Sequence, residues 1–409
     1  MTATSVLRDR SLRALLAAEV VSTTGGQMTW LALPWFVLFT SGSATRMTFV
    51  IAAELIGLGA LGLPGAKVLG RLGARRTMLL CDGARAPLML LLPLLHWSGV
   101  LSFPALLAVA FGVGALTAPY FAAQKLILPE LLGEDERRVS EANALFQGAT
   151  RLTLLLGPVA GGALIAAFDA PIVLVIDAAT YVVGFTLVAL FVPHRPPVVE
   201  EDADTSIRAG LRFLVHDPLL RVWSVVFALG DAAWTAFFAT VPVLVVVRFD
   251  ADPRIAGWLL ASFGAGALIG NGVAYRFLLK RVDGLRLIAV CIMGQALPLW
   301  LLTMELPAAA LSGALVVSGV ANGLVNPSLH TISTLRVPAP LRPAVMSVGM
   351  LLWAGVNPLG LFGVGPVLDA AGPEPVLVAF AATQTVMMAV VALSCVRAAA
   401  SPRPLTEQA

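Results

Sequence analysis

Long apolar runs alternate with short polar segments along almost the whole chain. About twenty apolar residues are needed for a helix to cross the hydrocarbon layer, and a helix satisfies its own backbone hydrogen bonds inside lipid. The pattern therefore predicts an all-α membrane protein with twelve transmembrane helices. These spans cover residues 14–39, 47–66, 77–96, 101–122, 142–167, 171–192, 221–246, 256–278, 286–304, 308–331, 344–366 and 376–396.

Composition agrees with a membrane protein. Charged residues make up 12% of the chain and hydrophobic residues 58%, whereas soluble domains carry about 25% charge. The three cysteines stand singly in different spans and no cluster with metal-ligand spacing is present, so we expect neither a disulfide nor a metal or other cofactor. The net charge of +3 follows from the charge bias of membrane loops and calls for no nucleic-acid partner.

The basic residues predict the orientation of the chain. Alternate loops collect most of the 27 Lys and Arg, and only Arg46, Arg248 and Arg254 fall in the other set of loops. Since basic loops stay on the cytoplasmic side, both termini are expected to be cytoplasmic. The first apolar run extends to Phe39 without a small-residue cleavage site, which favours an uncleaved first helix over a signal peptide.

The spans divide into two sets of six around one polar stretch. We expect an N-terminal bundle at 1–192, a cytoplasmic linker at 193–220, a C-terminal bundle at 221–397 and a cytoplasmic tail at 398–409. Apolar residues recur at helical spacing from Ile207 to Val215, which predicts a short amphipathic helix capped by Thr205 or Ser206. Two equal halves suggest bundles that rock around a central site, the physical basis of alternating access.

Two motifs carry a resemblance to a known family. The segment after the second span reads AKVLGRLGARR over residues 66–76, and the fifth span contains a glycine-rich segment around Pro158. Together with the order of the shorter motifs around them, these residues resemble the major facilitator superfamily, and within it the drug and siderophore exporters. The resemblance covers nearly the whole chain and implies a major facilitator fold.

The first motif implies a cytoplasmic gate. In the family, an acid in this loop helps to hold the cytoplasmic side closed, whereas Gly70 stands at that position here. Asp82 and Arg85, at i and i+3 in the third span, can form an ion pair nearby. The candidate gating residues are Gly70, Arg71, Gly73, Arg75, Arg76, Asp82 and Arg85.

The fifth span resembles the Gly-Pro motif of exporters and antiporters. Its glycines at i and i+4 allow two helices to touch backbone to backbone, and its proline permits a bend. Helix packing alone also explains such a pattern. The residues of this helix-packing and export motif are Gly148, Gly157, Pro158, Gly161 and Gly162.

Charged residues inside the spans are the candidates for coupling. An ionised side chain at mid-helix costs roughly 2.5 to 3.5 kcal/mol, so each needs a partner or water. The resemblance implies that the first, fourth, seventh and tenth spans line a cavity, which makes Asp231 and Glu19 the first candidates for a proton site and Glu54 the next. Asp177 fits a structural role better. The substrate-cavity candidates are Gln27, Trp30, Trp234, Arg151 and Asn326.

These observations predict a secondary active transporter of the cytoplasmic membrane that exports a hydrophobic or amphipathic small molecule, with proton antiport as the coupling. The chain has no GxxxxGK[ST] phosphate loop and no nucleophile-base pair at one depth, which argues against ATP-driven transport and against an enzyme. A nutrient-importing facilitator and a transport-inactive sensor or scaffold remain alternatives. Its expected partners are a small-molecule substrate, protons and membrane lipids, and we expect a monomer.

Overall fold

The computed structural model describes residues 9–61, 65, 69–133, 136–194, 207–279 and 281–400, and the regular elements in these ranges are helical. They form two compact units. Unit 1 holds the described residues up to 194 together with Asp252–Gly257, and unit 2 holds the described residues of 207–251 and those from Trp258 onward. Each unit has its own buried core of apolar side chains.

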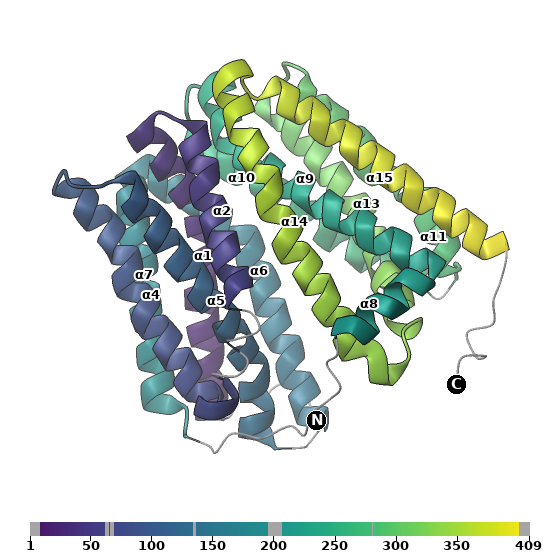
Figure 1. Ribbon diagram of the computed structural model, residues 1–409, viewed down its shortest axis with the longest axis horizontal. Coiled ribbons are helices and arrows are strands. Elements are labelled where there is room, and N and C mark those ends of the chain that lie inside the picture. The colour runs from purple at the N-terminus through teal and green to yellow at the C-terminus, as the bar shows by residue number, and fades with distance from the viewer. Residues whose placement is uncertain are drawn as a thin grey trace. The chain divides into compact units, whose positions relative to one another are not determined.

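Unit 1 is a bundle of long helices (Figure 1). Within it, α1 packs against α6 and α7, α2 against α5, and α4 against both α5 and α7. Its elements are α1 (Arg10–Ser41), α2 (Ala44–Ala60), α4 (Ala74–Trp97), α5 (Phe103–Leu132), α6 (Glu136–Phe168) and α7 (Ala170–Phe191).

Unit 2 begins with a short helix and continues with long ones. In it, α9 packs against α14 and α15, and α11 packs against α13 and α15. Its helices are α8 (Ile207–His216), α9 (Pro218–Arg248), α10 (Pro253–Val273), η2 (Ala274–Leu278), α11 (Gly284–Cys291), α12 (Met293–Ala296), η3 (Leu297–Thr303), α13 (Ala308–Leu335), η4 (Ala339–Leu341), α14 (Arg342–Ala371) and α15 (Glu374–Ala400). The start of α10, up to Gly257, belongs to unit 1.

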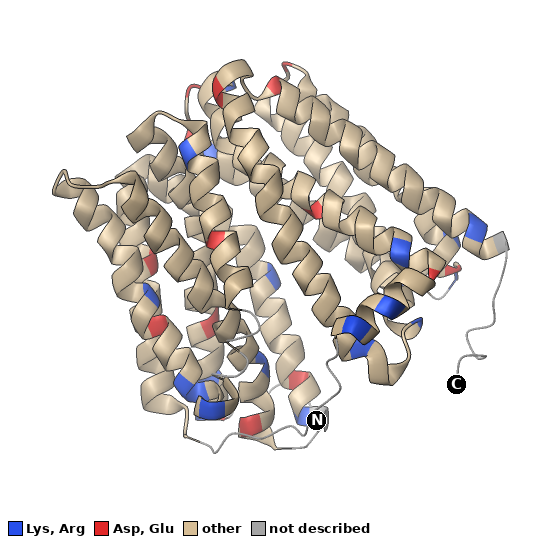
Figure 2. Ribbon diagram, viewed as in Figure 1, with Lys and Arg blue, Asp and Glu red and all other residues tan. Residues whose placement is uncertain are grey.

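Ten helical segments of the described chain are long and apolar enough to cross a membrane. The α2 helix has only 17 residues. Charged residues gather near helix ends, and few lie at mid-helix (Figure 2). Polar side chains cap several of these ends. Asp9 accepts the Ser11 amide at the start of α1, and Ser102 accepts the Ala105 amide at the start of α5.

The helix bounds differ from the predicted spans in two informative ways. The span predicted at 101–122 is the start of a helix that continues to Leu132, because the apolar run marks the membrane thickness and a helix can extend beyond it. The span predicted at 286–304 is not one continuous helix but the series α11, α12 and η3. Pro298 lies in this segment and has no backbone N–H to donate, which interrupts the α-helical pattern there.

Glycine brings the second and fourth long helices of each unit into backbone contact. In unit 1 a Cβ on Gly114 of α5 would collide with the carbonyl oxygen of Glu54 in α2. In unit 2 a Cβ on Gly319 of α13 would collide with the carbonyl oxygen of Phe263 in α10. The two units therefore use the same device at equivalent places, as expected of membrane bundles in which small residues allow close approach.

The amphipathic helix predicted near residue 207 is α8. Gly210 and Leu214 are buried, and Gly210 packs against the Ala344 carbonyl of α14. Leu211 and Val215 are exposed instead, so only part of the expected apolar face is covered by unit 2. The predicted caps, Thr205 and Ser206, lie outside the described residues.

Candidate functional site

An ion pair lies in the interior of unit 1. Asp82 and Arg85 are 0% and 4% exposed, and the Arg85 Nη2 atom donates to Asp82 Oδ1 at 2.5 Å. Their i, i+3 spacing on α4 places both side chains on one face of that helix. The structure therefore contains the pair that the sequence suggested, as a fully buried one. A buried charge is stable only with such a partner.

Two tyrosine rings flank the guanidinium group. Arg85 Cζ lies 4.2 Å from the ring centroid of Tyr120 in α5 and 4.6 Å from that of Tyr181 in α7. Aromatic faces attract a desolvated cation by roughly 2 kcal/mol. Sequence reasoning did not single out Tyr120. Spacing along the chain could not have identified it, because Arg85 and the two tyrosines lie on three different helices.

Glu19 of α1 is a second buried acid in the same unit. It is 4% exposed, and its Oε1 atom accepts from Thr23 at 2.8 Å and from Thr150 of α6 at 3.4 Å. Its Oε2 atom finds no hydrogen-bond partner among the described residues. Three more buried atoms of the described site share this property, Asp82 Oδ2, Arg85 Nε and the Tyr120 hydroxyl. Unpartnered polar atoms in a protein interior are sites for water, protons or ligand groups.

Asp177 of α7 is satisfied by hydroxyl groups. Thr29 of α1 donates to its Oδ2 atom at 2.6 Å, and Thr180 donates to its Oδ1 atom at 3.2 Å. Gly25 of α1 makes room for this contact, because a Cβ there would collide with Asp177 and Thr180. Glu54 of α2 is partly buried and within electrostatic range of Asp177. Four acids, Glu19, Glu54, Asp82 and Asp177, thus lie in one region of unit 1 together with Arg85.

Asp231 lies in a different environment, on α9 of unit 2. Asp231 is exposed. Its backbone carbonyl accepts a hydrogen bond from the Thr235 hydroxyl, which also donates to the Asn357 Oδ1 atom of α14 at 2.5 Å. Within the described structure no side chain forms an ion pair with Asp231. An ionised acid facing lipid at mid-helix would cost roughly 2.5 to 3.5 kcal/mol. Exposure on such a helix therefore favours a water-lined face.

Trp234 lies three residues after Asp231 on α9 and belongs to an aromatic cluster. Its ring centroid lies 4.3 Å from that of Phe263 in α10 and 5.0 Å from that of Phe380 in α15. Phe237 stacks on Phe380 at 4.8 Å. The indole is only partly exposed, so packing within unit 2 occupies most of its surface.

The remaining candidates for the substrate cavity are divided between the two units. Gln27 is half-buried on α1, while Trp30, three residues later, is 44% exposed. Arg151 is exposed on α6. Asn326 lies half-buried on α13 of unit 2. These positions are compatible with surfaces that a solute could reach, whereas the hydrogen bonds described for Glu19 and Asp177 go to threonine hydroxyls.

The candidate gate surrounds the start of α4. Gly73 adopts a φ of 78°, a conformation that favours glycine. Arg75 donates from Nε to the Val192 carbonyl at 2.6 Å and from Nη2 to the Ala189 carbonyl at 2.8 Å, which ties α4 to the end of α7. Gly70, Arg71 and Arg76 are exposed, and no described atom from another part of the chain lies within 4 Å of a Cβ built on Gly70.

The glycine-rich segment of α6 packs against α1. A Cβ on Gly157 would collide with the Gln27 side chain, and one on Gly161 would lie 3.1 Å from Met28 Cα. Gly162 approaches the backbone of Pro253, and the Pro158 carbonyl approaches Gly257, both in the segment that belongs to unit 1. Gly148 has open space around its Cα. Four residues of this motif therefore make close helix contacts, whereas Gly148 does not.

Long apolar helices arranged in two units, with charged side chains buried among them, define a multi-pass membrane protein. The chain belongs to the Major Facilitator Superfamily, whose sequence profile matches residues 15–361. Membership of this family makes it a transporter of the cytoplasmic membrane.

Curated relatives lie within the same family. The chain is 28% identical to the "Multidrug efflux pump Tap" of Mycolicibacterium fortuitum, over 88% of this chain and 89% of the relative. It is 25% identical to the protein of the same name in Mycobacterium tuberculosis (strain ATCC 25618 / H37Rv), over 90% of this chain and 89% of the relative. The sequence resemblance to this superfamily is thereby confirmed.

A solved structure shares the fold. A POT family transporter crystallised with a thioalcohol-conjugated peptide superposes with a TM-score of 0.73, covering 97% of each chain at 11% identity. At this identity the likeness concerns the fold alone.

Proposed function

We propose that the chain exports a hydrophobic or amphipathic small molecule, such as a drug, an antibiotic or a secondary metabolite, in exchange for protons. The observation that carries this proposal is the match, along nearly the full length of both chains, to relatives named as multidrug efflux pumps. The proposal includes twelve spans, cytoplasmic termini and alternating access between two six-helix bundles. It treats the protein as a monomer in contact with lipid.

The distribution of acids supports proton exchange. Asp231 is exposed on an apolar helix, where a water-lined face would let it gain and lose a proton. Glu19 has one carboxylate oxygen without a partner in the described structure, so it has an open acceptor for a proton. Glu54 is the third candidate. A solute that competes with a proton for one of these acids would couple the two movements.

The substrate surface is expected to be mixed in character. Trp30, which is 44% exposed, offers an aromatic face for an apolar body, and Trp234 offers only the part of its indole that the aromatic cluster leaves exposed. Gln27, Arg151 and Asn326 supply polar contacts. This combination suits a molecule with a large apolar part and few polar groups better than a sugar, which would need many hydrogen-bonding groups.

Flux in proteoliposomes tests the proposal. Purified protein is reconstituted, a pH gradient is imposed, and uphill movement of a fluorescent lipophilic cation such as ethidium is followed. We expect gradient-driven accumulation by the native chain and its loss in Asp231→Asn, with ethidium binding retained. Asp250→Asn, a loop acid of unit 2, is the matched control and should transport normally.

The other outcomes are equally informative. Flux that does not depend on the pH gradient would indicate that the protein is a facilitator. The absence of flux with every solute tested would favour a sensor or scaffold. A well-expressed Asp231→Asn protein that still pumps uphill would remove Asp231 from the coupling step and make Glu19 the next acid to test, with Glu54 after it.

A further inference from the structure

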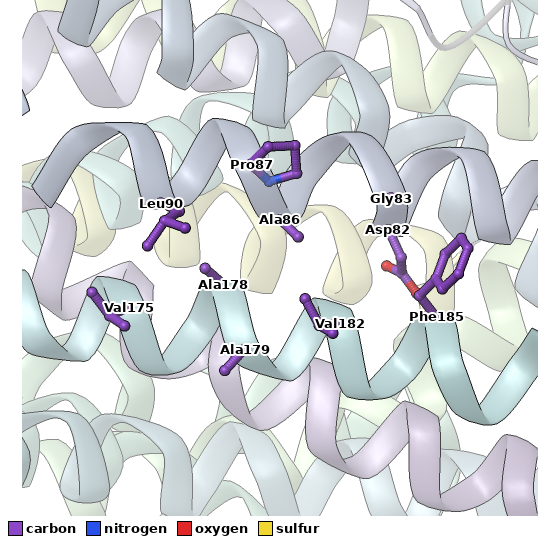
Figure 3. Close-up of a pocket in the computed structure, with 10 residues that line it drawn as sticks. All are labelled: Asp82, Gly83, Ala86, Pro87, Leu90, Val175, Ala178, Ala179, Val182 and Phe185. Atoms are coloured by element: carbon purple, nitrogen blue, oxygen red, sulfur yellow. The ribbon is translucent and has the colours of Figure 1, made fainter. Parts of the chain in front are cut away.

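Two of the cavities in the described structure differ in their chemistry. The groove between α4 and α7 of unit 1 is lined by apolar side chains and glycine apart from Asp82, which is 0% exposed (Figure 3). A larger pocket of about 1390 Å³ lies in unit 2, and four arginines line it: Arg221, Arg286, Arg336 and Arg397. The groove offers a ligand apolar contact, whereas the pocket also offers positive charge.

This basic pocket lies at one end of unit 2. Its lining residues come from the start of α9, from the start of α11 and the segment before it, and from the last turns of α13 and α15. The α9, α13 and α15 helices are long and apolar enough to cross a membrane, so their ends lie near its surface. The adjoining α8 exposes the apolar residues Leu211 and Val215, as helices in the membrane–water interface do. The basic pocket therefore lies at the depth of the lipid head groups.

Positive charge in the basic pocket is only partly balanced. Arg336 Nε donates to Asp217 Oδ2 at 2.6 Å. The other three arginines are exposed and form no ion pair within the described part of the chain: Arg221, Arg286 and Arg397. Asp283 is the one acid among the described lining residues, and its Oδ1 atom accepts the Arg286 amide at 3.1 Å. Counting Asp217 and Asp283 against four arginines leaves two positive charges.

These groups are suited to a phosphate. A guanidinium group can donate two parallel hydrogen bonds to phosphate oxygens, and the charge on both partners strengthens them. Ser328 and Thr331 of α13 also line the basic pocket, and their hydroxyl groups can donate to such oxygens. A cationic ligand would instead meet charge of its own sign.

The basic pocket has an apolar side as well. Leu393 of α15 and Val282, which precedes α11, line it and are 57% and 39% exposed. Because Leu393 lies on a helix that can span a bilayer, its exposed side chain is placed to contact acyl chains. A soluble anion would leave this apolar surface unused. A phospholipid would use both parts, with its phosphate among the arginines and an acyl chain along α15.

We propose that the basic pocket binds the head group of an anionic phospholipid such as phosphatidylglycerol. The phosphate accepts from Arg286 and Arg397, and an acyl chain lies against Leu393. In the proposed topology this end of unit 2 is cytoplasmic, where anionic lipids give the membrane surface its negative potential. The site goes beyond the proposed function, because lipid binding here uses none of the acids proposed for coupling and needs no transported substrate.

Photolabelling of the purified full chain in detergent tests this site. The probe is phosphatidylglycerol with a diazirine on one acyl chain close to the ester, and phosphatidylcholine with the same chain is the matched zwitterionic lipid. At about 0.15 M salt we expect phosphatidylglycerol to label peptides that contain residues 218–222 and 390–399. Its apparent affinity should be about tenfold higher than that of phosphatidylcholine.

A pair of double variants locates the charge that matters. Arg286→Gln/Arg397→Gln should lower the preference for phosphatidylglycerol to about twofold or less, because each arginine near an anionic head group contributes about fivefold in affinity. Both side chains are exposed, so Tm should stay within about 2 °C of the native value. Arg208→Gln/Arg212→Gln is the matched control. It removes two exposed arginines of α8 that do not line the basic pocket and should keep most of the preference.

Three results would overturn the proposal. Equal labelling by the two lipids would mean that the surface accepts any acyl chain. An equal loss of preference in the two double variants would assign the effect to the charge of the whole surface and not to the basic pocket. Displacement of the probe by millimolar inorganic phosphate, but not by sodium chloride of equal ionic strength, would assign the pocket to a soluble anion. None of these results depends on flux, so failure of the export proposal and failure of this site are separate findings.

Discussion

Replacing Arg85 by Met should destabilise unit 1 strongly. The substitution keeps an apolar stem of similar length but leaves Asp82 buried without its cation. Breaking a buried ion pair by removing one partner costs about 3–5 kcal/mol. The native guanidinium also lies against the rings of Tyr120 and Tyr181, and these contacts are lost with it.

The loss should be unequal for the two members of the pair. Arg85→Met leaves Glu19, Asp82 and Asp177 in one region with no cation. Asp82→Asn leaves Arg85 within electrostatic range of Asp177, so part of its charge remains compensated. We therefore expect Arg85→Met to be the more harmful substitution. The double variant Asp82→Asn/Arg85→Met should recover at least half of that loss, because it buries no unpaired charge at this position.

Thermal unfolding in detergent measures these differences. For a unit of this size each kcal/mol shifts Tm by about 2–4 °C, so about 3–5 kcal/mol corresponds to roughly 6–20 °C for Arg85→Met. Asp231→Asn is the control, since an exposed acid without an ion pair in the described structure should change Tm by only about 1–2 °C. A drop below about 2 °C for Arg85→Met would refute the reasoning, as would a double variant less stable than either single variant.

Three further outcomes are expected. Cysteine labelling in intact cells, with the native cysteines replaced, should leave Ala203→Cys protected from an impermeant reagent and label Ala251→Cys; labelling at 203 would reverse the predicted orientation. A Cβ at position 70 meets no described atom within 4 Å, so Gly70→Asp should be accommodated. It should shift the resting conformational equilibrium toward the outward-open state by about fivefold, the equivalent of one exposed salt bridge of about 1 kcal/mol. Unchanged spin-label distances across the loops near 70 and 340 would show that no latch forms. Gly114→Ala should lower the stability of unit 1 by about 1–3 kcal/mol, because the added methyl group overpacks against the α2 backbone. Gly148→Ala should be neutral or mildly stabilising in the same unfolding assay. Equal Tm shifts for the two variants would contradict the close approach of α2 and α5.

Hydrophobic runs predicted where the helices lie but not where they end. The run at 101–122 belongs to a helix that extends ten residues further to Leu132, because polar residues such as Gln124 and Lys125 are good helix formers outside the lipid. The interruption of the ninth span was equally hidden from hydropathy. Pro298 signalled it, but proline is tolerated in many other helices of this chain, including α1 at Pro34.

The buried charges could be identified singly from the sequence, because each one is costly in a membrane helix. Their partners could not. Thr29 donates to Asp177 across 148 positions of the chain, and only the packing of α1 on α7 brings them together. The Asp82–Arg85 pair was visible because both residues lie on one helix at i and i+3. Local spacing therefore predicts pairs within an element, whereas the tyrosine contacts of Arg85 depend on three helices.

The two units differ in how they hold polar groups, and this difference orders the functional tests. Among the described residues, the buried charged side chains Glu19, Asp82, Arg85 and Asp177 all belong to unit 1. Unit 2 buries neutral groups instead, such as Gln384, which donates to a backbone carbonyl at 3.0 Å. Removing an acid from unit 1 therefore changes the charge balance of a closed network, and loss of transport there must be separated from loss of folding. Asp231 stands outside any such network in the described structure, so its removal changes the chemistry of one site with little effect on stability. A transport defect in Asp231→Asn at native Tm and with ethidium binding retained would consequently report on coupling, whereas the same defect in a Glu19 variant gains that meaning only after its stability has been measured.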